Sequence, residues 1–264
     1  MTLVLTELSK FGVAMAADSA VTFPGGRVYI GAQKLLPVYK LNAGIAVWGQ
    51  GEIGNEDADI WLQKFIDNKT ENNMSLWNFA ELLADGLNKA FSGVIKERMG
   101  VHVAGFDKKQ GIFGPVFYHI HNGHYHLEYS NGSIKQISDE PHGNPPIREF
   151  RAHEDCAPKL YSDNDSHLTR NGDFSVFAIL KDKIEPIIKE VSLLTGLKFP
   201  YPLDLARRGE YLRFWVDTIV SVYRLSNKRI RILPQPATAG DASIGGPVTV
   251  LTISESGIES FYTK

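Results

Sequence analysis

The order of elements that the sequence predicts is typical of an α+β protein with four layers (αββα), in which two antiparallel sheets pack together and helices cover their outer faces. Strand patterns fill the first fifty residues, and apolar side chains at 3.6-residue spacing then indicate two helices. Strands, two further helices and two last strands follow. At 264 residues, we expect a single domain, 1–264, with a long insertion or loop at about 131–172.

The first fifty residues are predicted to be almost entirely sheet. Two runs at 2–9 and 12–18 flank a turn, and the alanines of the second run keep it thin enough for another sheet to approach closely. A turn at Pro24-Gly25-Gly26 leads into a meander that includes Gln33–Tyr39 and Gly44–Trp48.

The middle of the chain begins with two predicted helices. The first covers 57–67, and the second begins after Ser75, a plausible N-cap. Strands are expected at 101–106, 116–120 and 125–129, the last two joined by the hairpin signal Asn122-Gly123.

The stretch 131–172 is rich in Gly, Pro, Asn, Asp and Ser, and we expect no regular structure there. A helical pattern resumes at Asp173, with Pro186 expected to kink or interrupt it. Asp204 opens the last long helix, and strands at 248–253 and up to Tyr262 end the chain.

The composition excludes several function classes. Basic and acidic residues number 28 and 30, and no run of Lys and Arg matches a phosphate backbone, so we expect no nucleic-acid partner. The single cysteine, Cys156, cannot form an internal disulfide. Because no run of about 18 apolar residues occurs, we expect no membrane association and a cytoplasmic protein.

Thr2 is the candidate catalytic residue. Removal of Met1 would leave a residue that carries both a hydroxyl and a free α-amine. An α-amine has a pKa of about 7.7–8.0, so a useful fraction is neutral base at cellular pH. Thr2 could then deprotonate its own hydroxyl, directly or through a water, and attack a carbonyl.

Such a nucleophile needs a nearby cation, a carboxylate to hold that cation, and a hydrogen-bond donor for the oxyanion. Lys34 and Asp18 lie at or near strand ends that a meander places beside the first strand, and Gly49 can present an unobstructed N–H. The ordinary alternatives to these catalytic roles are that Asp18 only forms a turn and that Lys34 is only a solvated charge.

The segment Thr2–Thr22, with Gly-Val-Ala-Met-Ala-Ala-Asp-Ser-Ala-Val-Thr at 12–22, resembles the start of proteasome β-subunits, which are N-terminal nucleophile (Ntn) threonine proteases. Counted from Thr2, Asp18 and Lys34 fall on the family's catalytic Asp and Lys without a gap. Gly49 matches the oxyanion glycine after one inserted residue.

A second match lies near the C-terminus, where 240–253 is similar to the family's Asp-Ser-Gly-Gly segment and the strand after it. The resemblance implies that Asp241 supports the amine of the nucleophile. When this segment is aligned with the family's segment without a gap, the family's serine corresponds to Ile244, and Ser243 lies one position before it. The family's hairpin serine has no match, because Asn122 or Gly123 occupies its place.

The resemblance implies a proteasome-like threonine endopeptidase that needs no cofactor and cleaves peptides or unfolded proteins inside a homo-oligomeric ring, with an ATPase regulator as a further partner. The pocket positions carried over from the family imply an apolar, roomy site; they are Val21, Ala32, Leu36 and Val47. Two alternatives stay open: a small-amide hydrolase on the same fold, and a non-catalytic ring subunit that retains Met1.

Four histidines flank the Asn122-Gly123 turn. In a two-residue hairpin all four side chains would share one face; they are His119, His121, His124 and His126. Such a cluster could bind Zn²⁺, Cu²⁺ or Ni²⁺, or sense pH. The alternative, which we favour, is the polar face of a projecting hairpin.

Overall fold

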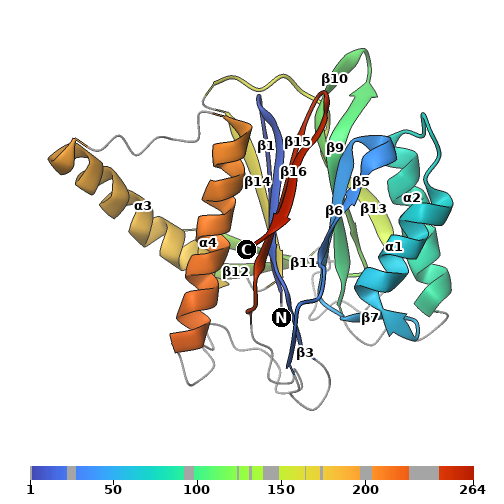
Figure 1. Cartoon of the computed structure of the whole chain (residues 1–264), viewed down its shortest axis with the longest axis horizontal. Helices are drawn as coiled ribbons and strands as arrows, with labels where there is room; N and C mark the ends of the chain where they lie inside the picture. The colour runs from blue at the N-terminus through green and yellow to red at the C-terminus, as the bar shows by residue number, and fades with distance from the viewer. Residues whose placement is uncertain are drawn as a thin grey trace.

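Two five-stranded antiparallel sheets face each other at the centre of the molecule (Figure 1). The computed structural model describes residues 2–22, 28–91, 98–123, 125–130, 133–138, 149–163, 165–172, 175–196, 204–225 and 244–264. Side chains are described for these residues except 22, 28, 125–130, 133–138, 175 and 225.

The first sheet contains both ends of the chain. Its strands lie in the order β14 (Ser166–Gly172), β1 (Leu3–Ser9), β2 (Gly12–Asp18), β15 (Val248–Ser254) and β16 (Gly257–Thr263). The thin strand β2 is buried on both faces, with Ala14 and Ala16 on the helix side and Met15 and Ala17 on the side of the other sheet.

The second sheet is built from the middle of the chain. Its order is β13 (Arg151–Cys156), β10 (Ile112–His121), β9 (Gly100–Lys109), β6 (Ala43–Trp48) and β5 (Leu35–Val38). Apolar side chains of both sheets fill the space between them, among them Leu8, Met15, Leu35, Phe117 and Leu251. This central layer fixes how the end of β2 lies relative to β5 and β6.

Helices cover the outer faces. Helices α1 (Ala58–Lys69) and α2 (Leu76–Phe91) pack on the second sheet, and α3 (Ser175–Thr195) and α4 (Leu205–Leu225) lie on the side of the first (Figure 1). Helix α4 approaches β15 closely, because a Cβ at Gly209 would lie 2.8 Å from a Thr252 methyl. Pro186 lies inside helix α3 and does not interrupt it, so of the two expected effects, a kink or an interruption, the interruption is absent.

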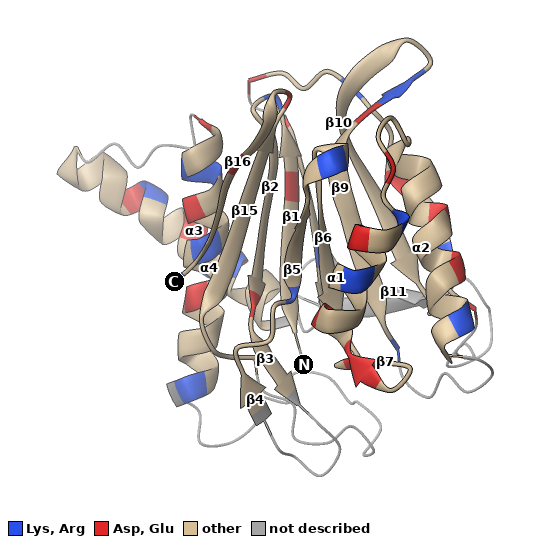
Figure 2. Ribbon diagram, turned by 45° about the vertical axis from the view of Figure 1, so that its right-hand side comes forward, with Lys and Arg blue, Asp and Glu red and all other residues tan. Residues whose placement is uncertain are grey.

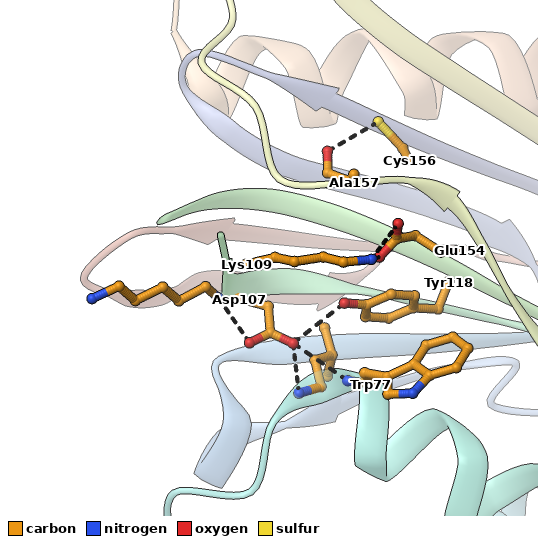
Figure 3. Close-up of polar contacts among 9 residues, drawn as sticks. Trp77, Asp107, Lys109, Tyr118, Glu154, Cys156 and Ala157 are labelled. Atoms are coloured by element: carbon orange, nitrogen blue, oxygen red, sulfur yellow. Dashed lines mark hydrogen bonds and ion pairs between the residues drawn. The ribbon is translucent and has the colours of Figure 1, made fainter. Parts of the chain in front are cut away.

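The N-terminus of α2 is fixed to the second sheet by Asp107 (Figure 3). The N–H groups of Leu76 and Trp77 donate to Asp107 Oδ2 at 2.9 and 3.3 Å, and the Tyr118 hydroxyl donates to the same oxygen at 3.3 Å. A carboxylate there satisfies helix N–H groups that have no partner within the helix.

The N-cap predicted at Ser75 and the helix start predicted at Asp204 are both confirmed. Ser75 Oγ accepts the N–H of Asn78 at 3.1 Å, and Asp204 Oδ1 accepts the N–H of Arg207 at 2.8 Å. The remaining short elements are β3 (Ala20–Thr22), β4 (Val28–Ile30), the 3₁₀ turn η1 (Tyr39–Leu41), β7 (Glu52–Ile53) and β8 (Glu56–Asp57).

The described residues of the stretch 131–172, for which no regular structure was predicted, include three strands. They are β12 (Ser133–Ser138), β13 and β14. The last two form one edge of each large sheet.

The hairpin predicted across Asn122-Gly123 is also wrong. Strand β10 already pairs with β9 and β13, so no free edge remains for β11 (Tyr125–Ser130), which pairs with β12 instead. The Asn122 side chain accepts the N–H of Met99 at 2.9 Å and closes the end of the β9–β10 pair.

None of the helices in the described part of the chain is long and apolar enough to cross a membrane.

Candidate active site

Asp18, the last residue of β2, is the centre of a buried hydrogen-bond network. Its Oδ1 atom accepts the N–H of Leu3 at 2.9 Å and the ammonium of Lys34 at 3.0 Å. Its Oδ2 atom accepts the N–H groups of Ala20 at 3.3 Å and Gly245 at 3.0 Å. One carboxylate therefore joins the start of β1, the residue before β5 and the approach to β15.

Lys34 is held in place rather than solvated. Its side chain is 4% exposed, and its ammonium donates to Asp18 and to the carbonyl of Ala20. Burial lowers the pKa of Lys34, and the Asp18 carboxylate opposes that shift. The Lys34 carbonyl accepts the N–H of Val47 at 2.9 Å, which ties this residue to β6.

Thr2, Lys34 and Gly49 line one cavity of about 160 Å³. Thr2 precedes β1, Lys34 precedes β5, and Gly49 follows β6. The structure thus brings together the predicted nucleophile, cation and oxyanion donor. Asp18 is linked to these three residues by its hydrogen bonds to the Lys34 ammonium and to the N–H of Leu3, the residue next to Thr2.

Only glycine fits at position 49. Its φ of +94° is one that L side chains rarely adopt, and a Cβ there would lie 2.2 Å from the carbonyl oxygen of Arg98. The neighbouring Met99 is held by Asn122, as described above. Asn122 therefore supports the backbone against which Gly49 packs.

The strand β14 supports Thr2 from the other side. Gly172 pairs with Leu3 in the sheet register, has a φ of +87°, and would place a Cβ 1.7 Å from the Thr2 carbonyl oxygen. A side chain at Gly172 would therefore displace the backbone of Thr2. This contact was not predicted from the sequence, because β14 is a polar edge strand without strong alternation.

The Gly245-Gly246 segment lies beside the site. The carbonyl of Gly245 accepts the N–H of Ser19 at 3.1 Å, and a Cβ at Gly246 would lie 2.3 Å from Ser19 Oγ. Ile244 is 2% exposed in the core under α4. Asp241 and Ser243 lie outside the described residues, so their predicted roles stay predictions.

Three of the four predicted pocket residues line the cavity, namely Val21, Ala32 and Val47. Leu36 does not, and that prediction is wrong. Its side chain is 2% exposed and packs in the core formed with α1 and α2, because it lies inside β5, whereas the cavity lies beyond that strand's start. The wall also includes polar groups, which the apolar expectation omitted.

The histidines form a different cluster from the predicted one. His119 lies opposite His102 of β9 and His153 of β13, and the ring centroid of His121 is 4.6 Å from that of His119. His124 and the side chain of His126 lie outside the description. Among the described residues, no group of three or more His, Cys, Asp or Glu side chains is placed to hold a metal ion.

His102 joins the two sheets. Its Nδ1 atom lies 2.8 Å from Thr6 Oγ1, and its Nε2 atom lies 2.7 Å from Asn171 Oδ1. Burial lowers the pKa of His102 to about 3, reinforced by the neighbouring His119 and opposed by the Asn171 hydrogen bond. We infer that His102 is neutral in the folded protein near pH 7.

Stability should therefore fall as the pH drops. An unfolded histidine has a pKa of about 6.5, so between there and about 3 the unfolded state binds one proton more than the folded state at His102. This group alone should lower the free energy of unfolding by about 1.4 kcal/mol per pH unit in that window. His102→Gln should flatten the slope measured by denaturant unfolding between pH 6 and 4.5. Parallel curves for the two proteins would contradict the assignment.

Comparison with known proteins supports the fold that was predicted from the sequence. No family model matches the sequence, and no curated protein matches it. Among solved structures, the chain is similar to Anbu (ancestral beta-subunit) from Yersinia bercovieri, with a TM-score of 0.51 and 15% sequence identity over 100% of this chain and 86% of that one. At this identity the likeness shows a shared fold. It agrees with the proteasome-like fold expected from the N-terminal residues.

Proposed function

We propose that the chain is a proteasome-like N-terminal nucleophile hydrolase, a threonine-type endopeptidase with the four-layer αββα arrangement of that class. Thr2, exposed by removal of Met1, is the nucleophile. The observation that carries the proposal is the shared oxygen of Asp18, which binds both the Lys34 ammonium and the N–H of Leu3, the residue next to Thr2. The cavity in front of these groups supports it.

In the first step, the Thr2 hydroxyl attacks the substrate carbonyl and its proton passes to the α-amine of the same residue. Lys34 stabilises the developing alkoxide, and Asp18 holds Lys34 in position. The N–H of Gly49 binds the oxyanion. The leaving amine takes the proton as the carbon–nitrogen bond breaks, which leaves an ester on Thr2.

In the second step, water attacks this ester. The α-amine accepts a proton from the water and returns it to the Thr2 oxygen as the carboxylic acid leaves. Asp241 and Ser243 stay candidates for a relay next to the amine.

The working form that we propose is a homo-oligomeric ring with the sites inside, which would limit cleavage to peptides and unfolded chains. A regulatory ATPase is a further partner that fits such a ring. The small-amide hydrolase and the non-catalytic subunit are the alternatives that an experiment must separate.

Intact-mass measurement with a peptide epoxyketone tests the proposal. This reagent needs both a hydroxyl and a free α-amine, so we expect loss of Met1 and gain of one full inhibitor mass. Thr2→Ser keeps both groups and should label, whereas Thr2→Ala should not. Retained Met1 without an adduct would establish the non-catalytic alternative. Turnover of acylated amines but not of fluorogenic peptides would favour the small-amide hydrolase.

A further inference from the structure

The cavity beside Thr2 has an apolar side and an acidic side. Val21, Ala32 and Val47 contribute apolar wall, and Gly51 leaves room for Val21, since a Cβ there would lie 2.3 Å from a Val21 methyl. Asp57 and Asp59, at the beginning of α1, contribute two carboxylates.

Neither carboxylate has a cation partner among the ion pairs of the described residues. Asp57 is exposed, and its side chain forms no cap hydrogen bond at α1. Asp59 accepts two backbone N–H groups, from Gln33 at 3.1 Å and Ile60 at 2.9 Å, and lines the cavity. Both residues thus offer a negative charge that no side chain described here neutralises.

A further acidic residue lies beside them. Glu52 of β7 is the cross-strand partner of Asp57 of β8, and both are exposed. Like charges placed directly opposite each other destabilise a strand pair. Figure 2 shows acidic residues in β7 and at the start of α1, at the end of the molecule where the chain begins. A cation bound at Asp57, which lines the cavity, would relieve this repulsion.

Gln50 gives an independent indication. Its Oε1 atom is buried, has no hydrogen-bond partner in the described part of the molecule, and belongs to a residue that lines the cavity. A buried acceptor without a donor is unfavourable. Its natural complement is a ligand that carries N–H groups.

Lys34 and Lys64 already form ion pairs with carboxylates of the chain. Lys34 also lines the cavity, but its charge is balanced by Asp18 at 3.0 Å. Lys64 of α1 pairs with Glu56. The cavity therefore presents two carboxylates and an amide oxygen to whatever enters it, without a free positive charge from the residues described.

We propose that this cavity receives a cationic side chain, of the lysine or arginine type, from the residue whose carbonyl Thr2 attacks. This inference rests on the proposed function. The aliphatic stem would pack on Val21, Ala32 and Val47, and the charged head would bind Asp57 and Asp59. The volume of about 160 Å³ lies well below the roughly 300–1,000 Å³ of pockets that enclose a drug-sized ligand, which suits a single side chain.

A matched pair of peptide epoxyketones tests this inference. The two reagents carry lysine or norleucine next to the warhead, so both present a four-carbon side chain and only lysine carries an ammonium group on its last carbon. The measured quantity is the second-order rate constant of adduct formation on Thr2, by intact mass. We expect the lysine reagent to react about 10- to 100-fold faster, as for hydrogen bonds to charged groups.

The double variant Asp57→Asn/Asp59→Asn should bring this ratio close to one, mainly by slowing the lysine reagent. Asp85→Asn, which removes an exposed carboxylate of α2 away from the cavity, should leave the ratio as it is. Adducts with both reagents but no preference for lysine, or a preference that survives the double variant, would overturn this inference alone. Absence of any adduct with either reagent would overturn the proposed function and this inference with it.

Discussion

Lys34→Met should slow the acylation of Thr2 by at least about 100-fold, the effect typical of losing one electrostatic stabiliser of a transition state. Methionine retains most of the apolar stem and removes the charge that we place next to the developing alkoxide. Among the described residues that line the cavity, Lys34 is the only lysine or arginine, and Asp18 and the Ala20 carbonyl hold its ammonium in place. The measurement is the rate of epoxyketone adduct formation, followed by intact mass.

Lys40→Met is the matched control for this prediction. Lys40 is exposed and lies six positions further along the same segment, where its ammonium donates to the Thr70 carbonyl at 3.1 Å. Its removal should leave the labelling rate unchanged. A Lys34→Met protein that is folded by near-UV circular dichroism and still labels at the wild-type rate would exclude the proposed role of Lys34.

Asp18→Asn should cost about 3–5 kcal/mol of unfolding free energy, the range for breaking a buried ion pair by removing one partner. The variant leaves the Lys34 ammonium buried without a counter-ion. It also replaces one acceptor oxygen by an amide donor that would face backbone N–H groups, so at least one of Leu3, Ala20 and Gly245 loses its partner. Guanidinium unfolding at pH 7 measures the change.

Asp163→Asn provides the comparison. This residue pairs with Lys10 at 2.6 Å, but its side chain is 82% exposed, and exposed pairs contribute little. We expect a denaturation midpoint close to that of the wild type. Equal midpoints for the Asp18 and Asp163 variants would show that the Asp18 network is not a source of stability.

The elements that the sequence predicted well are those whose burial leaves a periodic pattern. Strands β1, β2, β15 and β16 alternate or carry small apolar residues, and Ser75 and Asp204 mark helix starts through side chains that cap them. Strands β13 and β14 were missed. They are edge strands with few apolar residues, so their pairing depends on the backbone of β10 and β1 rather than on their own side chains.

The residues of the candidate site likewise fall into those that could be predicted from the sequence and those that could not. The expected meander and the resemblance to proteasome β-subunits predicted that Thr2, Asp18 and Lys34 lie close together, since each works through a side chain of a specific type. Gly172 and Gly245 could not be assigned from the sequence alone, because what they contribute is close backbone packing and one N–H group. The misplacement of Leu36 has a third cause: the apolar pattern of β5 does not say which face opens onto the cavity.

The hydrogen bond from Gly245 to Asp18 spans 227 positions of the chain. A ribosome must therefore add 227 residues after Asp18 before the carboxylate that orients Lys34 can accept the N–H of Gly245. Under the proposed function, a half-made chain carries the threonine but lacks this backbone support for the catalytic carboxylate.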